Sequence, residues 1–229
     1  MRNDPALYDD LVEQWWRPRG PFVMLHWLAA ARGSLVPPAD RRDAVLVDLG
    51  CGAGLLAPHI AGKGYRHVGV DRSAPSLRLA AEHGVHGVLG DVLAVPLADG
   101  AADVVVAGEI LEHVDDLPGA VAEACRLLRP GGALVIDTLA STMLCRWIAI
   151  GLAESVGLAP RGVHDPALLV DRDVLRQECE RHGVRLALRG IRPSMTDLVS
   201  WSLRRGSTVR MVPAPTTAVL FQGYGRKRG

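Results

Sequence analysis

The feature that most constrains this chain is a glycine-rich turn between an apolar run and a helical segment. The turn reads Gly50-Cys51-Gly52-Ala53-Gly54 and follows an apolar run at 45–49. Asp71 ends the next apolar run, 67–70, nineteen residues after Gly52. Strand, glycine turn, helix, strand and acid form the layout of a nucleoside-binding βαβ unit. In such a unit the glycines allow close approach of the backbone, and the acid accepts ribose hydroxyls.

The spacing of the glycines separates two kinds of cofactor. The dinucleotide fingerprint is G-x-G-x-x-G, whereas Gly54 comes one residue early and makes this turn G-x-G-x-G. That spacing resembles the first motif of the class I methyltransferases that use S-adenosylmethionine (SAM), and Asp48 matches their acid in strand one. The resemblance implies SAM rather than NAD as the cofactor.

Composition excludes several other classes of protein. The chain has 229 residues, enough for one well-buried domain. Its net charge of +1 gives no electrostatic reason to expect a nucleic-acid partner. The four cysteines form no C-x-x-C pair, and the polar N-terminus does not read as a signal peptide. The apolar stretch at 143–153 is too short to span a bilayer, so we expect a cytoplasmic protein.

Strands and helices alternate through the middle of the chain. Helical patterns at 5–16 and 22–35 precede strands at 45–49, 67–70, 86–90, 103–107 and 133–138, which alternate with helices at 55–62, 76–83 and 117–128. This alternation predicts a parallel sheet covered on both faces. An apolar helix at 142–156, a loop at 157–165, a helix at 171–182 and strands at 184–188 and 217–224 follow. The last two strands could pair as an antiparallel edge.

The expected fold class is therefore α/β. It is a single Rossmann-like methyltransferase domain at 41–229, with a mostly parallel seven-stranded sheet, helices on both faces and an antiparallel last strand. A helical cap at 1–40 would lie over the site, and an apolar lid or insert would occupy about 141–170.

Acidic residues follow the third and fourth strands. In the methyltransferase interpretation, Asp91 accepts the adenine amino group and the backbone N–H of Val92 meets the ring; the alternative is a loop acid that caps a turn. Glu109, Glu112 and His113 would share one face of a helix and converge at the strand ends. Two carboxylates and an imidazole can hold Mg²⁺ or Zn²⁺, which would lower the pKa of a bound phenol. The alternative is that the acids favour a helix N-terminus and His113 packs or acts as a base.

The N-terminal segment narrows the resemblance. Trp15-Trp16, Phe22, Leu25-His26 and Arg32 resemble the opening of the ubiquinone-biosynthesis O-methyltransferases. Further matches are the Glu109, Glu112 and His113 motif, Asp137-Thr138-Leu139 and Gly162-Val163-His164-Asp165. One departure is Ala29-Ala30-Ala31, where that family usually has an Asn-Pro pair before the arginine.

The resemblance implies a role for each matching residue. Arg32 would contact the SAM carboxylate, Asp71 the ribose and Gly108 the methionine end. The full set of expected cofactor-binding residues is Arg32, Asp48, Gly50, Cys51, Gly52, Asp71, Arg72, Asp91, Val92 and Gly108. The candidate catalytic residues are His113, His26 and His164, and the candidate metal ligands are Glu109, Glu112 and His113. Paired tryptophans also suit a hydrophobic staple that holds the N-terminal helices over the site.

The implied function is SAM-dependent O-methyl transfer to a phenolic or catechol hydroxyl of a quinol precursor or related aromatic metabolite. The alternatives are an N-, C- or RNA methyltransferase, an NAD-binding oxidoreductase and a non-catalytic SAM-binding protein. An RNA-end methyltransferase group that shares the Glu-x-x-Glu-His motif adds a second nearby histidine, and none lies between His113 and His164. The segment at about 143–153 lies where the family has a membrane-touching insert. It would contact the inner face of the membrane or a polyprenyl tail, or else serve as a lid or dimer contact.

Overall fold

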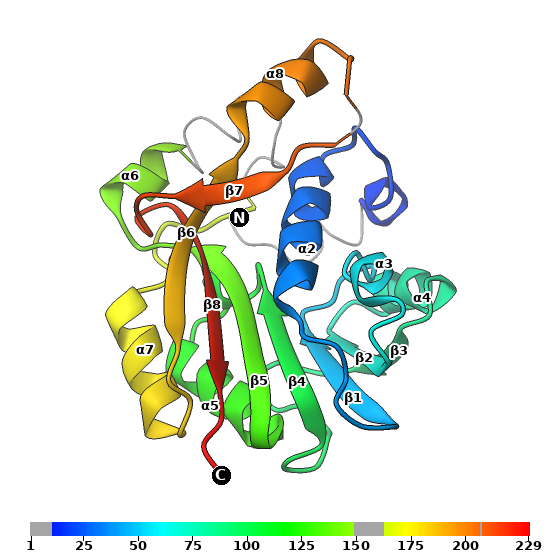
Figure 1. Cartoon of the computed structure of the whole chain (residues 1–229), viewed down its shortest axis with the longest axis vertical. Helices are drawn as coiled ribbons and strands as arrows, with labels where there is room; N and C mark the ends of the chain where they lie inside the picture. The colour runs from blue at the N-terminus through cyan, green and yellow to red at the C-terminus, as the bar shows by residue number, and fades with distance from the viewer. Residues whose placement is uncertain (1–10, 149–162, 207) are drawn as a thin grey trace.

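An eight-stranded sheet runs through the part of the chain that the computed structural model describes, residues 11–148, 163–206 and 208–229 (Figure 1). The strand order is β3-β2-β1-β4-β5-β8-β6-β7. Strands β1 to β5 pair in parallel, whereas β8 is antiparallel to both β5 and β6, and β7 is antiparallel to β6. The strands are β1 Ala44–Leu49, β2 Tyr65–Asp71, β3 His86–Leu89, β4 Ala102–Gly108, β5 Leu128–Leu139, β6 Ala187–Pro193, β7 Met211–Ala214 and β8 Leu220–Arg226.

Helices connect the strands, and several begin at a side-chain cap. Ser73 accepts a hydrogen bond from Ser76 N at the start of α4, and Asp116 and Asp171 do the same for α5 and α7. Two short 3₁₀ helices, η1 and η2, are also present. The helices are η1 Val12–Gln14, α2 Val23–Leu35, α3 Ala57–Ile60, α4 Ala74–Glu82, η2 Leu111–His113, α5 Leu117–Leu127, α6 Met143–Cys145, α7 Arg172–Arg181 and α8 Met195–Ser202.

The central strands are apolar on both faces because helices cover both. Every residue of β4 is buried. Successive side chains alternate between two core clusters: Val105 packs with residues of α5 and α7, and its neighbours Val104 and Val106 pack with Leu56 and Ile60 near α3. This two-sided burial explains why β4 reads as a continuous apolar run.

The expected fold class is confirmed, with one correction to the sheet. The structure has eight strands rather than seven, because β7 adds a short antiparallel edge against β6. Its four residues include Pro213, which is tolerated at a sheet edge but hides a strand from pattern analysis. Helix α8 was also not foreseen.

Some expectations fall on residues outside the described part of the chain. They concern the first half of the helix expected at 5–16 and most of the apolar helix expected at 142–156; the described part of the latter begins with α6. The division into a cap at 1–40 and a domain at 41–229, with a lid at 141–170, stays a prediction. No helix in the described part combines the length and apolar character needed to cross a membrane.

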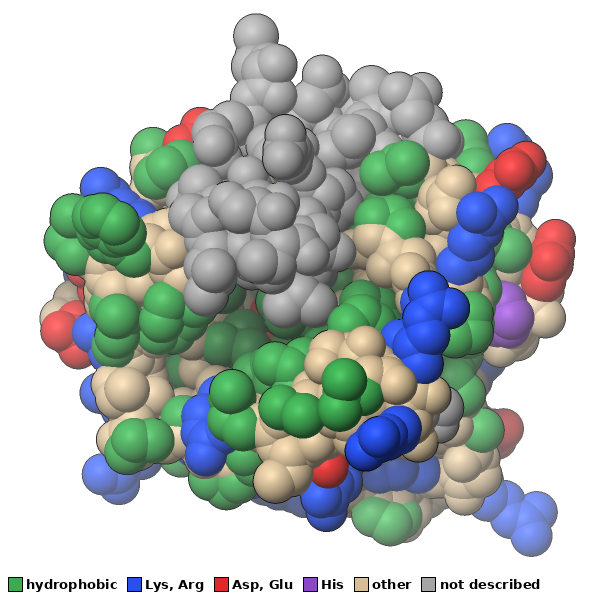
Figure 2. Space-filling view, turned by 90° about the horizontal axis from the view of Figure 1, so that it is seen from above, with side chains coloured by type: hydrophobic (Ala, Val, Ile, Leu, Met, Phe, Trp, Pro, Cys, Tyr) green, Lys and Arg blue, Asp and Glu red, His purple; other side chains and the backbone are tan. Residues whose placement is uncertain are grey.

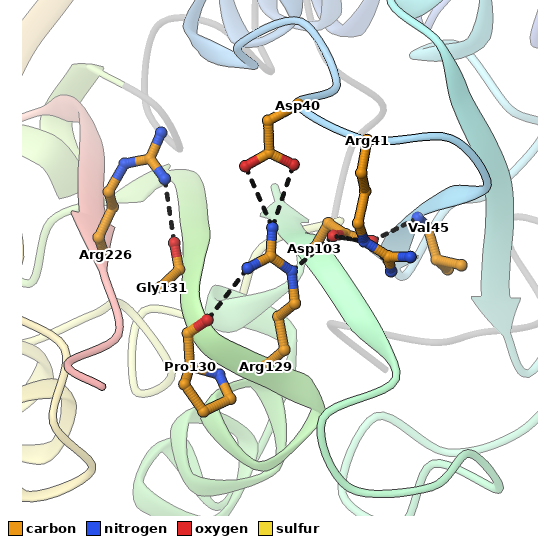
Figure 3. A network of polar contacts seen from close by, with 8 residues as sticks. All are labelled: Asp40, Arg41, Val45, Asp103, Arg129, Pro130, Gly131 and Arg226. Atoms are coloured by element: carbon orange, nitrogen blue, oxygen red, sulfur yellow. Dashed lines mark hydrogen bonds and ion pairs between the residues drawn. The ribbon is translucent and has the colours of Figure 1, made fainter.

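Asp103 ties together the end of the sheet opposite the glycine turn (Figure 3). Its carboxylate, 3% exposed, accepts hydrogen bonds from Arg41 Nε and Nη2 at 2.7 Å, from Val45 N at 2.7 Å and from Arg129 Nε at 2.5 Å. Arg129 also reaches Asp40. Burial raises the pKa of Asp103, but these hydrogen bonds outweigh burial and bring the pKa to about 2.

Replacing Asp103 with asparagine is expected to destabilise the fold by about 2 kcal/mol at neutral pH, because Arg41 and Arg129 lose their shared carboxylate. A carboxyl whose folded-state pKa is depressed stabilises the fold above its unfolded pKa. The difference in free energy of unfolding between the parent protein and Asp103→Asn should therefore shrink as pH falls from about 5 toward 3. Urea unfolding at several pH values measures both effects. Asp40→Asn is the control, because Asp40 is 64% exposed and should cost less than about 0.5 kcal/mol. Equal losses in both variants would contradict the role given to Asp103.

Candidate functional site

A cavity of about 290 Å³ opens at the carboxyl ends of β1, β2 and β4. Residues of α2 and of the segment before it form another wall of this cavity. Parallel α/β sheets bind ligands at this edge. Every residue expected from the sequence to bind the cofactor lines this one cavity: Arg32, Asp48, Gly50, Cys51, Gly52, Asp71, Arg72, Asp91, Val92 and Gly108. The structure therefore brings the whole set together, while their contacts with a cofactor stay predictions.

The glycine turn has backbone angles that favour glycine. Gly50, Gly52 and Gly54 have φ of +66°, +50° and +79°. A Cβ on Gly52 would lie 2.5 Å from the Trp15 ring, and one on Gly50 would run into Ile110. Both the turn and the close approach of its neighbours thus require these glycines.

Asp71 holds the turn and also faces the cavity. One carboxylate oxygen accepts a hydrogen bond from Gly52 N at 2.8 Å and the other from Ser73 N at 2.9 Å. Burial raises the pKa of Asp71 above its ordinary value. Each oxygen retains a second lone pair, so the carboxylate can also accept bonds from a ligand.

Asp91 caps a turn, and its role toward the adenine stays a prediction. Its Oδ1 accepts a hydrogen bond from Leu93 N at 2.9 Å, which is the turn-capping role, and the residue also lines the cavity. The Arg72 guanidinium lies 3.9 Å from Asp91, with both side chains partly exposed.

Arg32 reaches the cavity from α2 and is held by a buried carboxylate. Its Nε bonds to both oxygens of Asp137, at 3.0 and 2.9 Å, and its Nη2 lies 2.9 Å from Asp137 Oδ1. The guanidinium sits directly over Gly108, where any Cβ would overlap it. Burial lowers the pKa of Arg32, but the charge and hydrogen bonds of Asp137, together with the charges of Asp48 and Glu109, outweigh burial and raise the pKa. Asp137 matches a family motif in the sequence, but its contact with Arg32 was not expected from the sequence.

Glu109 does not lie on a helix, which corrects the expected arrangement of the acidic motif. Its φ is +52°, a strained value for a residue with a side chain, and only the 3₁₀ turn η2 follows it. Its backbone N–H donates to Asp137 O at 2.9 Å. Burial, followed by the charge of Glu112, raises the pKa of the Glu109 carboxyl well above its ordinary value.

The structure brings His164 to Glu112 and His113. One possible ligand atom from each of these residues lies within 4.8 Å of the other two, and Glu109 is not part of this cluster. The imidazole rings of His113 and His164 are stacked, with centroids 5.7 Å apart. His113 and His164 line the cavity, and Glu112 is buried. His164 was expected from the sequence to be a substrate-side or base residue and not a ligand, because only the folded chain brings it to η2.

Charge within this cluster is set by burial. Burial raises the pKa of Glu112 to about 7, against the lowering effect of a 2.6 Å hydrogen bond from Thr138 Oγ1 to Glu112 Oε2. Glu112 Oε1 is buried and accepts no hydrogen bond from the described residues. Burial, with a smaller contribution from His164, lowers the pKa of His113 to about 3, so its imidazole is neutral at neutral pH. A neutral imidazole is the form that binds metal ions.

The aromatic residues of the N-terminal segment fasten it over the glycine turn. Trp15 stacks on Phe22 with ring centroids 4.4 Å apart, and Trp16 Nε1 donates to Ala53 O at 3.1 Å. His26 Nε2 lies 2.7 Å from Trp15 O, and His26 is not among the described residues that line the cavity. These contacts support the staple interpretation of the tryptophans. A catalytic role for His26 stays a prediction, and the observed contact is structural.

Known proteins resemble this chain in sequence. The model of a methyltransferase domain family matches residues 47–136. A ubiquinone biosynthesis O-methyltransferase from Methylobacterium sp. (strain 4-46) is 33% identical over 205 residues, which cover 81% of this chain and 82% of the relative. The protein of the same description from Bordetella pertussis is 37% identical over 174 residues, 69% of each chain.

Solved structures agree on the fold. A SAM-dependent methyltransferase from Thermotoga maritima, described as a possible histamine N-methyltransferase, superposes with a TM-score of 0.66 at 16% identity and covers 97% of both chains. Geranyl diphosphate C-methyltransferase from Streptomyces coelicolor, solved with Mg²⁺, geranyl diphosphate and S-adenosylhomocysteine (SAH), gives a TM-score of 0.60 at 19% identity. That match covers 90% of this chain and 82% of the other.

Proposed function

The chain belongs to the family of ubiquinone biosynthesis O-methyltransferases, and from this membership we propose that it methylates a phenolic or catechol hydroxyl of a quinol precursor or a related aromatic metabolite. It is a SAM-dependent methyltransferase. The observation that carries the acceptor proposal is the Glu112, His113 and His164 cluster, which borders the same cavity as the expected cofactor residues.

The two ends of SAM would lie at opposite ends of the cavity. The acids Asp71 and Asp91, at the ends of β2 and β3, suit the ribose and the adenine amino group. Arg32, over Gly108 at the end of β4, suits the carboxylate of the amino-acid end. The sulfonium methyl would then face the loop that carries Glu109 and His113.

The cluster fits a divalent cation such as Mg²⁺ or Zn²⁺. It offers one carboxylate with a buried, unbonded Oε1 and two imidazoles, of which His113 is neutral at neutral pH. Glu112, His113 and His164 would hold the ion. A bound divalent ion supplies Lewis acidity that lowers the pKa of a phenol.

The protein's own residues provide the rest of the chemistry. Val114, Val163 and Leu25 give the cavity apolar walls that suit a flat aromatic ring and exclude water from the sulfonium. Thr138 fixes Glu112 through Oε2 and leaves Oε1 directed elsewhere. Without an ion, the raised pKa of Glu112, about 7, suits it to take the phenol proton itself.

A prenyl tail on the acceptor would suit the upper face of the molecule. Met143 in α6 and Trp147 just after it are 66% and 73% exposed, and Met195, Val199 and Leu203 are exposed in or just after α8. Figure 2 shows hydrophobic and basic side chains interspersed on this face. We therefore propose that this face contacts the tail of the acceptor or the membrane that holds it.

The test is methyl transfer from labelled SAM to two catechols that differ only in a short prenyl chain, with Mg²⁺ or Zn²⁺ and again with EDTA. Product that is lost with EDTA and formed faster on the prenylated catechol is the expected result. Equal product formation with and without EDTA would show that O-methyl transfer needs no metal ion, and it would assign the proton transfer to Glu112. SAH binding without product on either catechol would contradict the proposed acceptor.

A further inference from the structure

Four polar side chains from four separate elements lie in one row that ends at the cavity. Arg32 of α2 bonds to Asp137 of β5, and Asp137 is paired across strands with Gln222 of β8. Gln222 Oε1 accepts hydrogen bonds from Arg189 of β6, from Nη2 at 2.9 Å and from Nε at 3.2 Å. Asp137 and Gln222 are both fully buried, whereas Arg189 is exposed. This row of side chains thus runs from the surface of β6 to the cavity.

The orientation of Arg32 follows from its contacts. Asp137 takes Nε and Nη2, so the edge that carries Nη1 points away from the carboxylate and over Gly108. Two arginines line the cavity among the described residues. Arg72 is 70% exposed beside Asp91, so Arg32 is the arginine at the Gly108 end.

Gln222 lies beside Asp137 on the neighbouring strand β8. An amide has one acceptor end and one donor end, and Arg189 occupies the acceptor end of Gln222. The Nε2 end of Gln222 is buried and makes no hydrogen bond within the described part of the chain. Burial raises the pKa of Asp137, and the nearby Gln222 amide is among the groups that lower it. The backbone carbonyl of Asp137 also accepts a hydrogen bond from Glu109 N. Asp137 therefore also holds the strained residue at which the segment with Glu109, Glu112 and His113 begins. A buried arginine needs such a partner, because an unpaired guanidinium would be a buried charge without compensation and would adopt other rotamers.

We propose that Asp137 is a positioning residue for the amino-acid end of SAM. It presents Arg32 to the cofactor carboxylate, and Gln222 and Arg189, which lie beside Asp137 on the neighbouring strands, restrict its movement. The role concerns cofactor binding, so it is independent of which acceptor the enzyme uses and of whether a metal takes part.

The experiment compares two ligands by isothermal titration calorimetry. SAH and 5′-methylthioadenosine share the adenosine and the thioether, but the second lacks the carboxylate and the amine. Asp137→Asn is expected to weaken SAH binding about 10- to 100-fold and to leave methylthioadenosine within about threefold. In the transferase assay, KM for SAM should rise more than kcat falls. Equal losses for both ligands, or none for either, would overturn the proposal.

Two milder variants keep the test decisive if Asp137→Asn does not fold. Gln222→Leu and Arg189→Ala leave the Arg32–Asp137 pair in place and remove its support. Both should weaken SAH selectively, by about three- to tenfold, with the larger effect at Gln222. Arg192→Ala is the matched control, because Arg192 lies on the same strand, is exposed, and bonds only its neighbour Pro193 O among the described residues. A loss of SAH affinity equal to that of the control would overturn the role of Gln222 and Arg189.

Discussion

Replacing His164 with alanine is expected to lower kcat for methyl transfer by about 100-fold or more and to leave SAH affinity within about threefold. His164 joins Glu112 and His113 in the cluster that we propose to hold the metal and the acceptor oxygen. The residues that we propose for the ribose, the adenine and the carboxylate of the cofactor are Asp71, Asp91 and Arg32, which are not part of this cluster. The loss should therefore appear in the chemical step and not in cofactor binding.

Single-turnover transfer from labelled SAM measures the first effect, and calorimetric titration with Zn²⁺ in the absence of substrate measures ion binding directly. The Zn²⁺ affinity of the variant should fall at least about tenfold, because one of three ligands is gone. His182→Ala is the control, since His182 is exposed at the end of α7. Turnover within threefold of the parent protein, with unchanged Zn²⁺ binding, would remove His164 from the site.

Replacing Asp71 with alanine is expected to weaken SAH binding about 100-fold. The variant loses the carboxylate that faces the cavity and also the hydrogen bond that holds Gly52 N. Because the ribose is common to both ligands, the affinity for 5′-methylthioadenosine should fall in parallel with that for SAH. This parallel loss is the opposite of the selective loss expected for Asp137→Asn, so the two variants identify the two ends of the cofactor site.

The measurement is again calorimetry with both ligands. Asp71→Asn is the matched variant, because it keeps one oxygen acceptor and should show a smaller loss than alanine. Affinity for methylthioadenosine that is unchanged in Asp71→Ala would contradict a ribose role for this residue.

Much of the fold could be predicted from local pattern. The helix at 22–35, the strands around the glycine turn and the helix after Asp116 all appear within a few residues of their expected bounds. Strand β7 and helix α8 were missed because both are short, and half-buried edge elements leave weak periodicity. Helical periodicity also misplaced Glu109, which has a positive φ and whose N–H continues the β4–β5 ladder by donating to Asp137 O.

The sequence by itself determined the nucleoside-binding unit, because a G-x-G-x-G turn and an acid at the next strand end are local requirements of backbone geometry. Only the tertiary structure decided that His164 completes the cluster with Glu112 and His113. It alone also placed Asp137 against Arg32, with Gln222 and Arg189 beside Asp137 in the same sheet. These partners lie far apart in sequence and meet only because β5, β8 and β6 are neighbours in one sheet. Local chemistry therefore predicts which residues can bind, and the packing of distant strands determines which of them act together.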